Sequence, residues 1–168
     1  AWVFTSQNAV KNLPEISFSG PVYASGNQTA KALMEKGFEV KLGANETALS
    51  LAKKITEDGV KSVVFFCGNM RRNELPEYLA KKNIELTEIV VYQTILSPKS
   101  LQIHKGDALF FMSPSAVESF AMKNEFHSEI NYYSIGETTA EALRNKGVKK
   151  INTAAEATFE AMLKKYTS

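Results

Sequence analysis

The stretch YASGNQTAKALMEKGF, residues Tyr23–Phe38, occurs a second time in this chain as YSIGETTAEALRNKGV, residues Tyr133–Val148. The copies are 110 residues apart, and eight of their sixteen positions are identical. A shorter pair precedes them, FTSQNAV from Phe4 and FMSPSAV from Phe111. Solenoid proteins repeat every 20 to 50 residues, roughly, so this longer period indicates one domain used twice. Two similar domains in one chain predict a cleft between them, which is a common place for a small-molecule site.

The composition is that of an ordinary globular protein, with 44% hydrophobic residues and a net charge of +2. This balance does not favour nucleic acid as a partner, since duplex binders usually carry a dense basic face. No apolar stretch approaches the roughly 20 residues that cross a bilayer, and the N-terminus does not resemble a signal peptide. Cys67 is the only cysteine, so we expect no disulfide framework and a cytoplasmic location.

Short β-rich runs alternate with amphipathic helical runs along the whole chain. This alternation predicts the α/β class: two similar small domains, each a mainly parallel sheet flanked by helices, with a cleft between them. We expect the first domain at residues 1–93 and the second at 94–168. The predicted strands are Ala1–Phe4, Pro21–Ala24, Glu39–Leu42, Ser62–Phe66, Thr87–Gln93, Ala108–Met112, Asn131–Ile135 and Val148–Asn152. The clearest predicted helices are Thr29–Lys36, Thr47–Glu57, Asn73–Lys82 and Thr158–Tyr166.

The two halves differ in length. The first continues after its repeat with another βαβ unit, from Lys61 to Gln93, whereas the second stops at Ser168. We therefore expect the second domain to lack a βα unit. The chain also starts abruptly, because Ala1 already reads as the middle of a strand. An N-terminal segment that is absent from this sequence could supply that unit.

Several helix ends carry recognisable signals. Ser113 followed by Pro114 fits an N-cap with proline at the first helical position. The run from Thr138 to Glu141 fits a capping box. Gly37 and Gly147 directly follow their helices, where a left-handed C-terminal residue favours glycine.

Several familiar sites are absent from the sequence. It contains neither a P-loop nor the glycine fingerprint of dinucleotide-binding folds. His104 and His127 have no metal-ligand spacing with Cys67. We interpret both histidines as surface residues and Cys67 as a small apolar core residue, and we expect neither a metal nor another cofactor.

A hydroxyl-rich junction follows five of the predicted strands, in four cases beside a glycine or a proline. In a parallel sheet these junctions lie at the carboxyl ends of the strands, where ligands bind. Helix N-terminal N–H groups and neighbouring hydroxyls suit anions, so we expect a ligand rich in carboxylates or phosphates. The alternative is that each Ser or Thr only caps a helix. The junctions begin at Thr5, Ser25, Cys67, Ser113 and Gly136.

Three further residues have two interpretations each. Arg71 and Arg72 are expected to open a helix, where the helix dipole disfavours cations. They are therefore either anion contacts or part of a solvated helix end. Tyr92 ends a predicted strand just before the second domain, so it is either a core or hinge residue or a hydroxyl that faces the cleft.

The chain resembles the uroporphyrinogen-III synthase family over nearly its whole length. Each matching element is weak alone, but the set is specific because it occurs in the family's order. The elements are FTSQNAV, VYASGNQTAKAL, FFCGNMRRNELPEYL, VVYQT, FFMSPSAVESF and YSIGETTAEAL. The resemblance implies two α/β domains joined by a pair of strands, with an N-terminal segment that begins in the domain formed by residues 95–168. We expect this sequence to depart from the pattern in lacking that segment.

The resemblance also implies a reaction. Hydroxymethylbilane, a linear tetrapyrrole with eight carboxylates, would lose water and close to uroporphyrinogen III with inversion of ring D. By resemblance, Tyr92 is the catalytic candidate, a general acid that helps the hydroxyl leave. The expected partners are this substrate and, transiently, the deaminase that makes it, and we expect a monomer. The substrate-binding candidates are Thr29, Ser113, Ser115, Thr138 and Thr139, with Ser6 and Asn69 as weaker ones.

Two other interpretations remain open from the sequence. The chain could be a two-domain protein that binds or senses an anionic small molecule without catalysis, although the ordered motifs weigh against this. It could also be a single receiver-like or flavodoxin-like domain, against which the internal repeat argues. Formation of the type III isomer would distinguish the synthase from a binding protein.

Overall fold

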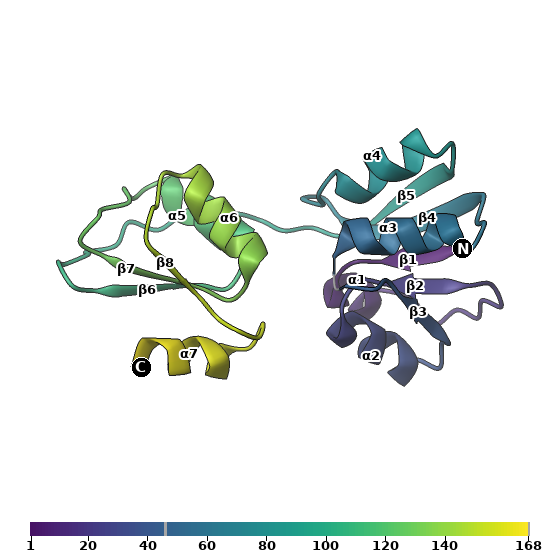
Figure 1. Cartoon of the computed structure of the whole chain (residues 1–168), viewed down its shortest axis with the longest axis horizontal. Helices are drawn as coiled ribbons and strands as arrows, with labels where there is room; N and C mark the ends of the chain where they lie inside the picture. Colours follow the sequence, from purple (N-terminus) through teal and green to yellow (C-terminus); the bar gives the residue numbers. More distant parts are fainter. Residues whose placement is uncertain (46, 168) are drawn as a thin grey trace. The chain divides into compact units, whose positions relative to one another are not determined.

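The structure, a computed structural model, describes residues 1–45 and 47–167. It divides into two compact units, Ala1–Thr94 and Ile95–Ser168. All eight predicted strands form (Figure 1). Their bounds are β1 (Trp2–Phe4), β2 (Val22–Ala24), β3 (Val40–Leu42), β4 (Ser62–Gly68), β5 (Glu85–Tyr92), β6 (Ala108–Phe111), β7 (Asn131–Ser134) and β8 (Ile151–Thr153). The helices are α1 (Gln7–Lys11), α2 (Asn27–Glu35), α3 (Ala48–Glu57), α4 (Glu74–Lys81), α5 (Pro114–Ala121), α6 (Glu137–Asn145) and α7 (Phe159–Thr167).

The first unit is a doubly wound parallel sheet in the order β3-β2-β1-β4-β5. Its central strands β1, β2 and β4 are largely buried, as a parallel sheet covered on both faces requires. Alternate residues of β1 face opposite cores. Trp2 and Phe4 pack with residues of α1 and α2, whereas Val3 packs with residues of α3 and α4. Figure 1 accordingly shows α1 and α2 on one side of this sheet and α3 and α4 on the other.

The second unit has a three-stranded parallel sheet in the order β6-β7-β8. Helices α5 and α6 pack on one face, and α7 packs on the other through Met162. Its β-α order repeats that of β1 to α3, so β6 is the counterpart of β1. Within the described part of the chain β6 pairs with β7 alone, whereas β1 pairs with both β2 and β4. The second sheet therefore has an open edge at β6.

The internal repeat is structural as well as sequential. Residues 21–30 and 131–140 share one burial pattern from the strand into the first turn of the helix, apart from the first residue. Gly37 and Gly147 follow α2 and α6 with φ of 87° each, which confirms the predicted left-handed C-terminal glycines. The last strand was predicted too early, because it begins at Ile151 rather than at Val148.

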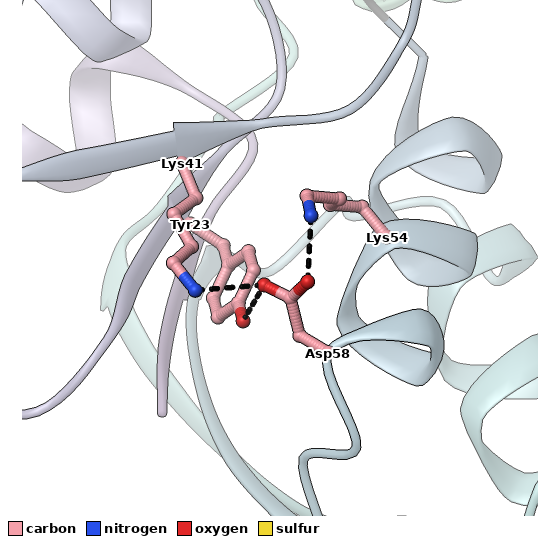
Figure 2. Close-up of polar contacts among 4 residues, drawn as sticks. All are labelled: Tyr23, Lys41, Lys54 and Asp58. Carbon is pink, nitrogen blue, oxygen red and sulfur yellow. Dashed lines mark hydrogen bonds and ion pairs between the residues drawn. The ribbon is translucent and has the colours of Figure 1, made fainter.

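A polar cluster fastens β2 and β3 to the end of α3 (Figure 2). Tyr23 and Lys41 are register partners on β2 and β3, so their side chains extend to the same face. Both reach the carboxylate of Asp58, the residue that ends α3. The Tyr23 hydroxyl donates at 2.7 Å and Lys41 Nζ at 2.9 Å, while Lys54 Nζ donates at 2.6 Å from within the helix.

The contacts in this cluster stabilise the ionised form of Asp58 and the protonated form of Tyr23. Hydrogen bonds from Lys54, Lys41 and Tyr23 hold the pKa of the Asp58 carboxyl well below its usual range. Burial, followed by the hydrogen bond to Asp58, raises the pKa of Tyr23. Asp58 lies between α3 and the start of β4, at the amino-terminal edge of the sheet. Because ligands of such sheets bind at the opposite edge, we assign this cluster to stability.

We predict that Tyr23→Phe lowers the free energy of unfolding by about 1 to 2 kcal/mol, because it removes a hydrogen bond to a charged acceptor. The matched control is Tyr133→Phe, at the equivalent position of the second repeat. The Tyr133 hydroxyl makes no hydrogen bond to another described residue. Urea unfolding monitored by circular dichroism measures both losses, and equal losses would contradict the assigned role.

We also predict that Asp58→Asn lowers the melting temperature at pH 7 and that this deficit shrinks in acid. A carboxyl whose pKa is depressed in the folded state stabilises it fully above the unfolded pKa, about 4. That stabilisation is lost as the pH falls toward the lower folded value. Melting curves of both proteins from pH 7 to pH 3 test this, and a deficit that stays constant would refute it.

Candidate functional site

The strand ends of the first unit bring four sequence-predicted residues to one edge of the sheet. Since every strand runs in the same direction, all carboxyl ends meet at that edge. Ser6 follows β1, Asn69 follows β4, and Tyr92 is the last residue of β5. Thr29 lies in the first turn of α2, which follows β2. Crossovers change direction between β1 and β4, and this switch point is the usual ligand position of a doubly wound sheet.

Ser6 is the N-cap of α1, and its Oγ accepts a hydrogen bond from Asn8 N at 3.2 Å. The alternative interpretation of the strand-end hydroxyls, that each caps a helix, therefore holds for Ser6. The hydroxyl hydrogen is not used by that contact, so Ser6 can still donate to an anion.

Glycine starts the helix in both copies of the long repeat. The N-cap of α2 is Gly26, with φ of 81°, and the N-cap of α6 is Gly136, in an extended conformation. Neither cap supplies a side-chain hydrogen bond to its helix, in contrast to the serine and threonine caps elsewhere. The predicted capping box at Thr138 is therefore wrong, because α6 already begins at Glu137. Glycine at the N-cap leaves the start of each helix without a side-chain acceptor from that residue, which suits an anionic ligand, although in α6 Thr139 N donates to Gly136 O at 3.1 Å.

Thr29 and Thr139 occupy the same place in these two helices. Both are buried, with 5% and 2% of their surface exposed. A ligand at the helix N-terminus would therefore not reach their hydroxyls readily, and the backbone N–H of Thr139 already donates to Gly136 O at 3.1 Å. Thr138 is exposed and therefore presents its side chain at the surface of the second unit.

Ser113 and Ser115 open α5 at the end of β6. Ser113 is the N-cap, as predicted, and accepts from Ala116 N at 3.2 Å, with Pro114 at the first helical position. Its Oγ lies 3.0 Å from the Oγ of Ser115. The two half-buried hydroxyls thus form a linked pair beside the N-terminus of α5.

Tyr92 and Asn69 lie together at the ends of β5 and β4. Tyr92 is half-buried and packs against the core on the α1 and α2 face. Asn69 N donates to Tyr92 O at 3.3 Å. The Asn69 side chain accepts from Thr94 N at 2.7 Å and donates to Thr94 O at 3.3 Å. The side-chain amide of Asn69 is thus hydrogen-bonded to the backbone of Thr94, two residues after Tyr92.

The expectation that Arg71 and Arg72 open a helix is wrong. Helix α4 begins at Glu74, and both arginines precede it. Arg71 pairs with Glu88 through two contacts, Nε to Oε1 at 2.7 Å and Nη2 to Oε2 at 2.8 Å. The hydrogen bond to Glu88 raises the pKa of Arg71. Arg71 therefore ties the loop after β4 to β5, a role that local sequence patterns do not reveal.

Other sequence-predicted residues lie where expected. Cys67 is a free cysteine with 2% of its surface exposed, and burial raises the pKa of its thiol. His104 and His127 are exposed. Among residues 1–45 and 47–167, no group of three or more His, Cys, Asp or Glu side chains could hold a metal ion. Within those same ranges, no helix has both the length and the apolar character to cross a membrane.

Hollows also exist away from these strand ends. One, of about 500 Å³, lies in the second unit between Phe126, Tyr132 and Val148. Another, of about 610 Å³, lies in the first unit between Pro14, Phe18 and Phe38. Both are lined mainly by residues that precede strands, so they lie toward the amino-terminal edges of the sheets. We give more weight to the carboxyl edge, because helix N-termini and hydroxyls gather there.

The fold and the strand-end residues place this chain in the class of doubly wound α/β proteins. A family model described as uroporphyrinogen-III synthase HemD matches residues 1–164. The chain therefore belongs to the uroporphyrinogen-III synthase family, whose members are lyases of tetrapyrrole biosynthesis.

Solved structures agree with this assignment. The chain is similar to uroporphyrinogen-III synthetase from Helicobacter pylori, with 27% identity and a TM-score of 0.69, covering 99% of this chain and 81% of that one. It also shares its fold with a mutant uroporphyrinogen-III synthase from Thermus thermophilus, at 19% identity and a TM-score of 0.74, covering 99% and 76%. The wild-type Thermus thermophilus enzyme gives 20% identity and a TM-score of 0.60, covering 99% and 78%.

We predict that Ser113→Ala lowers the free energy of unfolding by about 1 kcal/mol, because it removes an N-cap. The matched variant Ser115→Ala changes it by less than about 0.5 kcal/mol, since Ser115 lies within the helix and caps nothing. Denaturant unfolding of the three proteins measures both values. Equal losses would show that the hydroxyl pair, and not the cap, stabilises α5.

Proposed function

We propose that this protein closes hydroxymethylbilane to uroporphyrinogen III, with loss of water and inversion of ring D. The observation that carries the proposal is the match of residues 1–164 to the synthase family. Similarity to the Helicobacter pylori enzyme over 99% of this chain supports it.

In this proposal Tyr92 is the general acid. Its phenol donates a proton to the leaving hydroxyl, the C–O bond breaks and water departs. The substituted α-carbon of ring D then bonds to the freed methylene of ring A to give a spiro intermediate, and its bond to the bridge carbon from ring C breaks. The free α-carbon of ring D bonds to that bridge carbon and closes the ring, and the proton that it loses restores the phenol. Among the described residues the Tyr92 hydroxyl has no hydrogen-bond partner, so its proton is available for donation.

The remaining candidates bind the carboxylates of the substrate, partly through backbone N–H groups. Gly26 and Gly136 support this role because they leave helix N-termini without a side-chain cap. The proposed binding residues are Ser6, Thr29 and Asn69 in the first unit and Ser113, Ser115, Thr138 and Thr139 in the second.

Neutral hydrogen-bond donors, such as hydroxyls and backbone N–H groups, are sufficient for the proposed cyclisation. The hydroxyl leaves readily from an electron-rich pyrrole, so a strong acid is not needed. The difficulty is geometric, because unassisted closure gives the isomer in which ring D is not inverted. An enzyme that constrains the shape of its substrate lowers the barrier by positioning.

A coupled assay tests the proposal. Hydroxymethylbilane is generated from porphobilinogen with a purified deaminase in the presence of this protein, and the oxidised uroporphyrin isomers are separated by chromatography. We expect an excess of isomer III over a control without the protein. Isomer I alone, together with a ligand-dependent change in the protein, would favour a binding protein without catalysis.

We predict that Tyr92→Phe lowers the turnover number by tens-fold or less, because positioning contributes most of the acceleration. The same assay measures the rate of isomer III formation, and circular dichroism checks that the variant is folded. A folded variant that loses about 10⁴ in rate would show instead that Tyr92 is an essential acid.

A further inference from the structure

We propose that Gly68 and Asn69 are positioning residues for Tyr92: Gly68 sets the place of its phenol, and Asn69 fixes the backbone that carries it. This inference rests on the proposed function, in which the Tyr92 hydroxyl donates a proton. It concerns how the chain positions the Tyr92 side chain, whose hydroxyl makes no hydrogen bond to a described residue.

An irregularity in the pairing of β4 with β5 decides which way Tyr92 points. Cys67 pairs with Val90, but Gly68 pairs with Tyr92, so Val91 is an extra residue on β5. In an unbroken register Val91 would face Gly68, and Tyr92 would point to the opposite face of the sheet. A bulge of this kind re-aims a side chain, and bulges are frequent beside active sites.

The core contacts agree with this reading of the register. Cys67 packs in the cluster on the α3 and α4 face, whereas Phe66 packs in the cluster on the α1 and α2 face. Val91 and Tyr92 are consecutive, yet both pack against the second of these clusters. Two successive residues of a regular strand would face opposite sides, so the bulge is what brings Tyr92 onto the face of Gly68.

Gly68 leaves the space that the phenol fills. A Cβ on Gly68 would lie 2.4 Å from Cζ of Tyr92 and 2.8 Å from its hydroxyl oxygen. Gly68 is not among the glycines with a left-handed backbone, so alanine would be unstrained there. The three atoms nearest to that Cβ all belong to the phenol of Tyr92. Because this end of the side chain is flexible, alanine would displace the phenol rather than break the strand.

Asn69 holds the chain on both sides of Gln93. Its backbone N–H donates to Tyr92 O at 3.3 Å. Its side chain accepts from Thr94 N at 2.7 Å and donates to Thr94 O at 3.3 Å. These three hydrogen bonds fix the backbone of residues 92–94 against the end of β4. The bulge, the glycine and the amide thus determine both where the Tyr92 Cα lies and where its ring can go.

The consequence for catalysis is geometric. A general acid works only within hydrogen-bond reach of the oxygen that it protonates, and a displacement of about 1 Å can cost a large factor in rate. Since packing alone holds the phenol, one added methyl group at Gly68 should act as if the hydroxyl had been removed.

A double-mutant cycle tests the role of Gly68. The turnover number is measured for the wild type, Gly68→Ala, Tyr92→Phe and the double variant. We expect Gly68→Ala to lower it about as much as Tyr92→Phe does, with KM changed by less than about twofold. Phenylalanine keeps the ring and therefore the steric conflict, but it has no hydroxyl to misplace. In that background Gly68→Ala should change turnover by less than about twofold. An equal loss in both backgrounds would refute the proposal.

Asn69 is tested by separating turnover from KM. Asn69→Ala should lower the turnover number, because Tyr92 becomes less well placed. Asn69→Asp keeps an acceptor for Thr94 N and should restore most of the loss. If Asn69→Ala raises KM and leaves turnover unchanged, Asn69 acts only as a substrate contact, as listed under the proposed function, and its positioning role is refuted.

A second readout does not depend on activity. In protein labelled with 3-fluorotyrosine, the ¹⁹F resonance of Tyr92 is assigned by its absence in Tyr92→Phe. Gly68→Ala should move this resonance. Gly136→Ala should leave it in place, since a Cβ on Gly136 meets no atom within 4 Å. An unmoved resonance in Gly68→Ala would refute the inference even if activity fell. If the wild type forms no isomer III, the proposed function fails, and the resonance alone decides whether Gly68 places the phenol.

Discussion

The parallel pairing of β1 with β2 on one side and β4 on the other is the constraint on which the rest of the first unit depends. Parallel strands need helical crossovers, which bury both faces of the sheet and bring every strand end to one edge. The residues after β1, β2, β4 and β5 meet there for that reason. The same constraint explains why the Tyr23 and Asp58 cluster, at the amino-terminal edge, serves stability. The proposed binding residues and the Tyr23 and Asp58 cluster thus lie at opposite edges of one sheet.

The chain uses two kinds of strand-to-helix junction. Where a helix starts with serine, as at Ser6 and Ser113, the hydroxyl caps the helix and retains a hydrogen that it can donate. Where it starts with glycine, as at Gly26 and Gly136, the N-cap residue supplies no side-chain hydrogen bond to the first turn. Under the proposed function, both kinds would bind the carboxylates of the substrate through neutral hydrogen-bond donors. Arg71, which could have been such a cation, is paired with Glu88 instead.

Much of the fold could be predicted from the sequence because it is local. Strand periodicity, the Ser113-Pro114 cap and the glycines after α2 and α6 each depend on a few neighbouring residues. The errors were local as well. The Thr138 capping motif competed with Gly136, just before it in the chain, and the helix started at the glycine. Arg71 and Arg72 were expected to open a helix, although α4 begins only at Glu74.

The sequence by itself determined the α/β class, the internal repeat and the family, because repeated motifs in a fixed order can be recognised without knowing which residues are in contact. Only the tertiary structure decided that β5 carries a bulge at Val91, that Tyr92 lies over Gly68, and that Asp58 joins β2 to α3. These features link residues that are far apart in the chain, through strand register and sheet order. Register is a property of two strands together, so no periodicity within one strand reveals it.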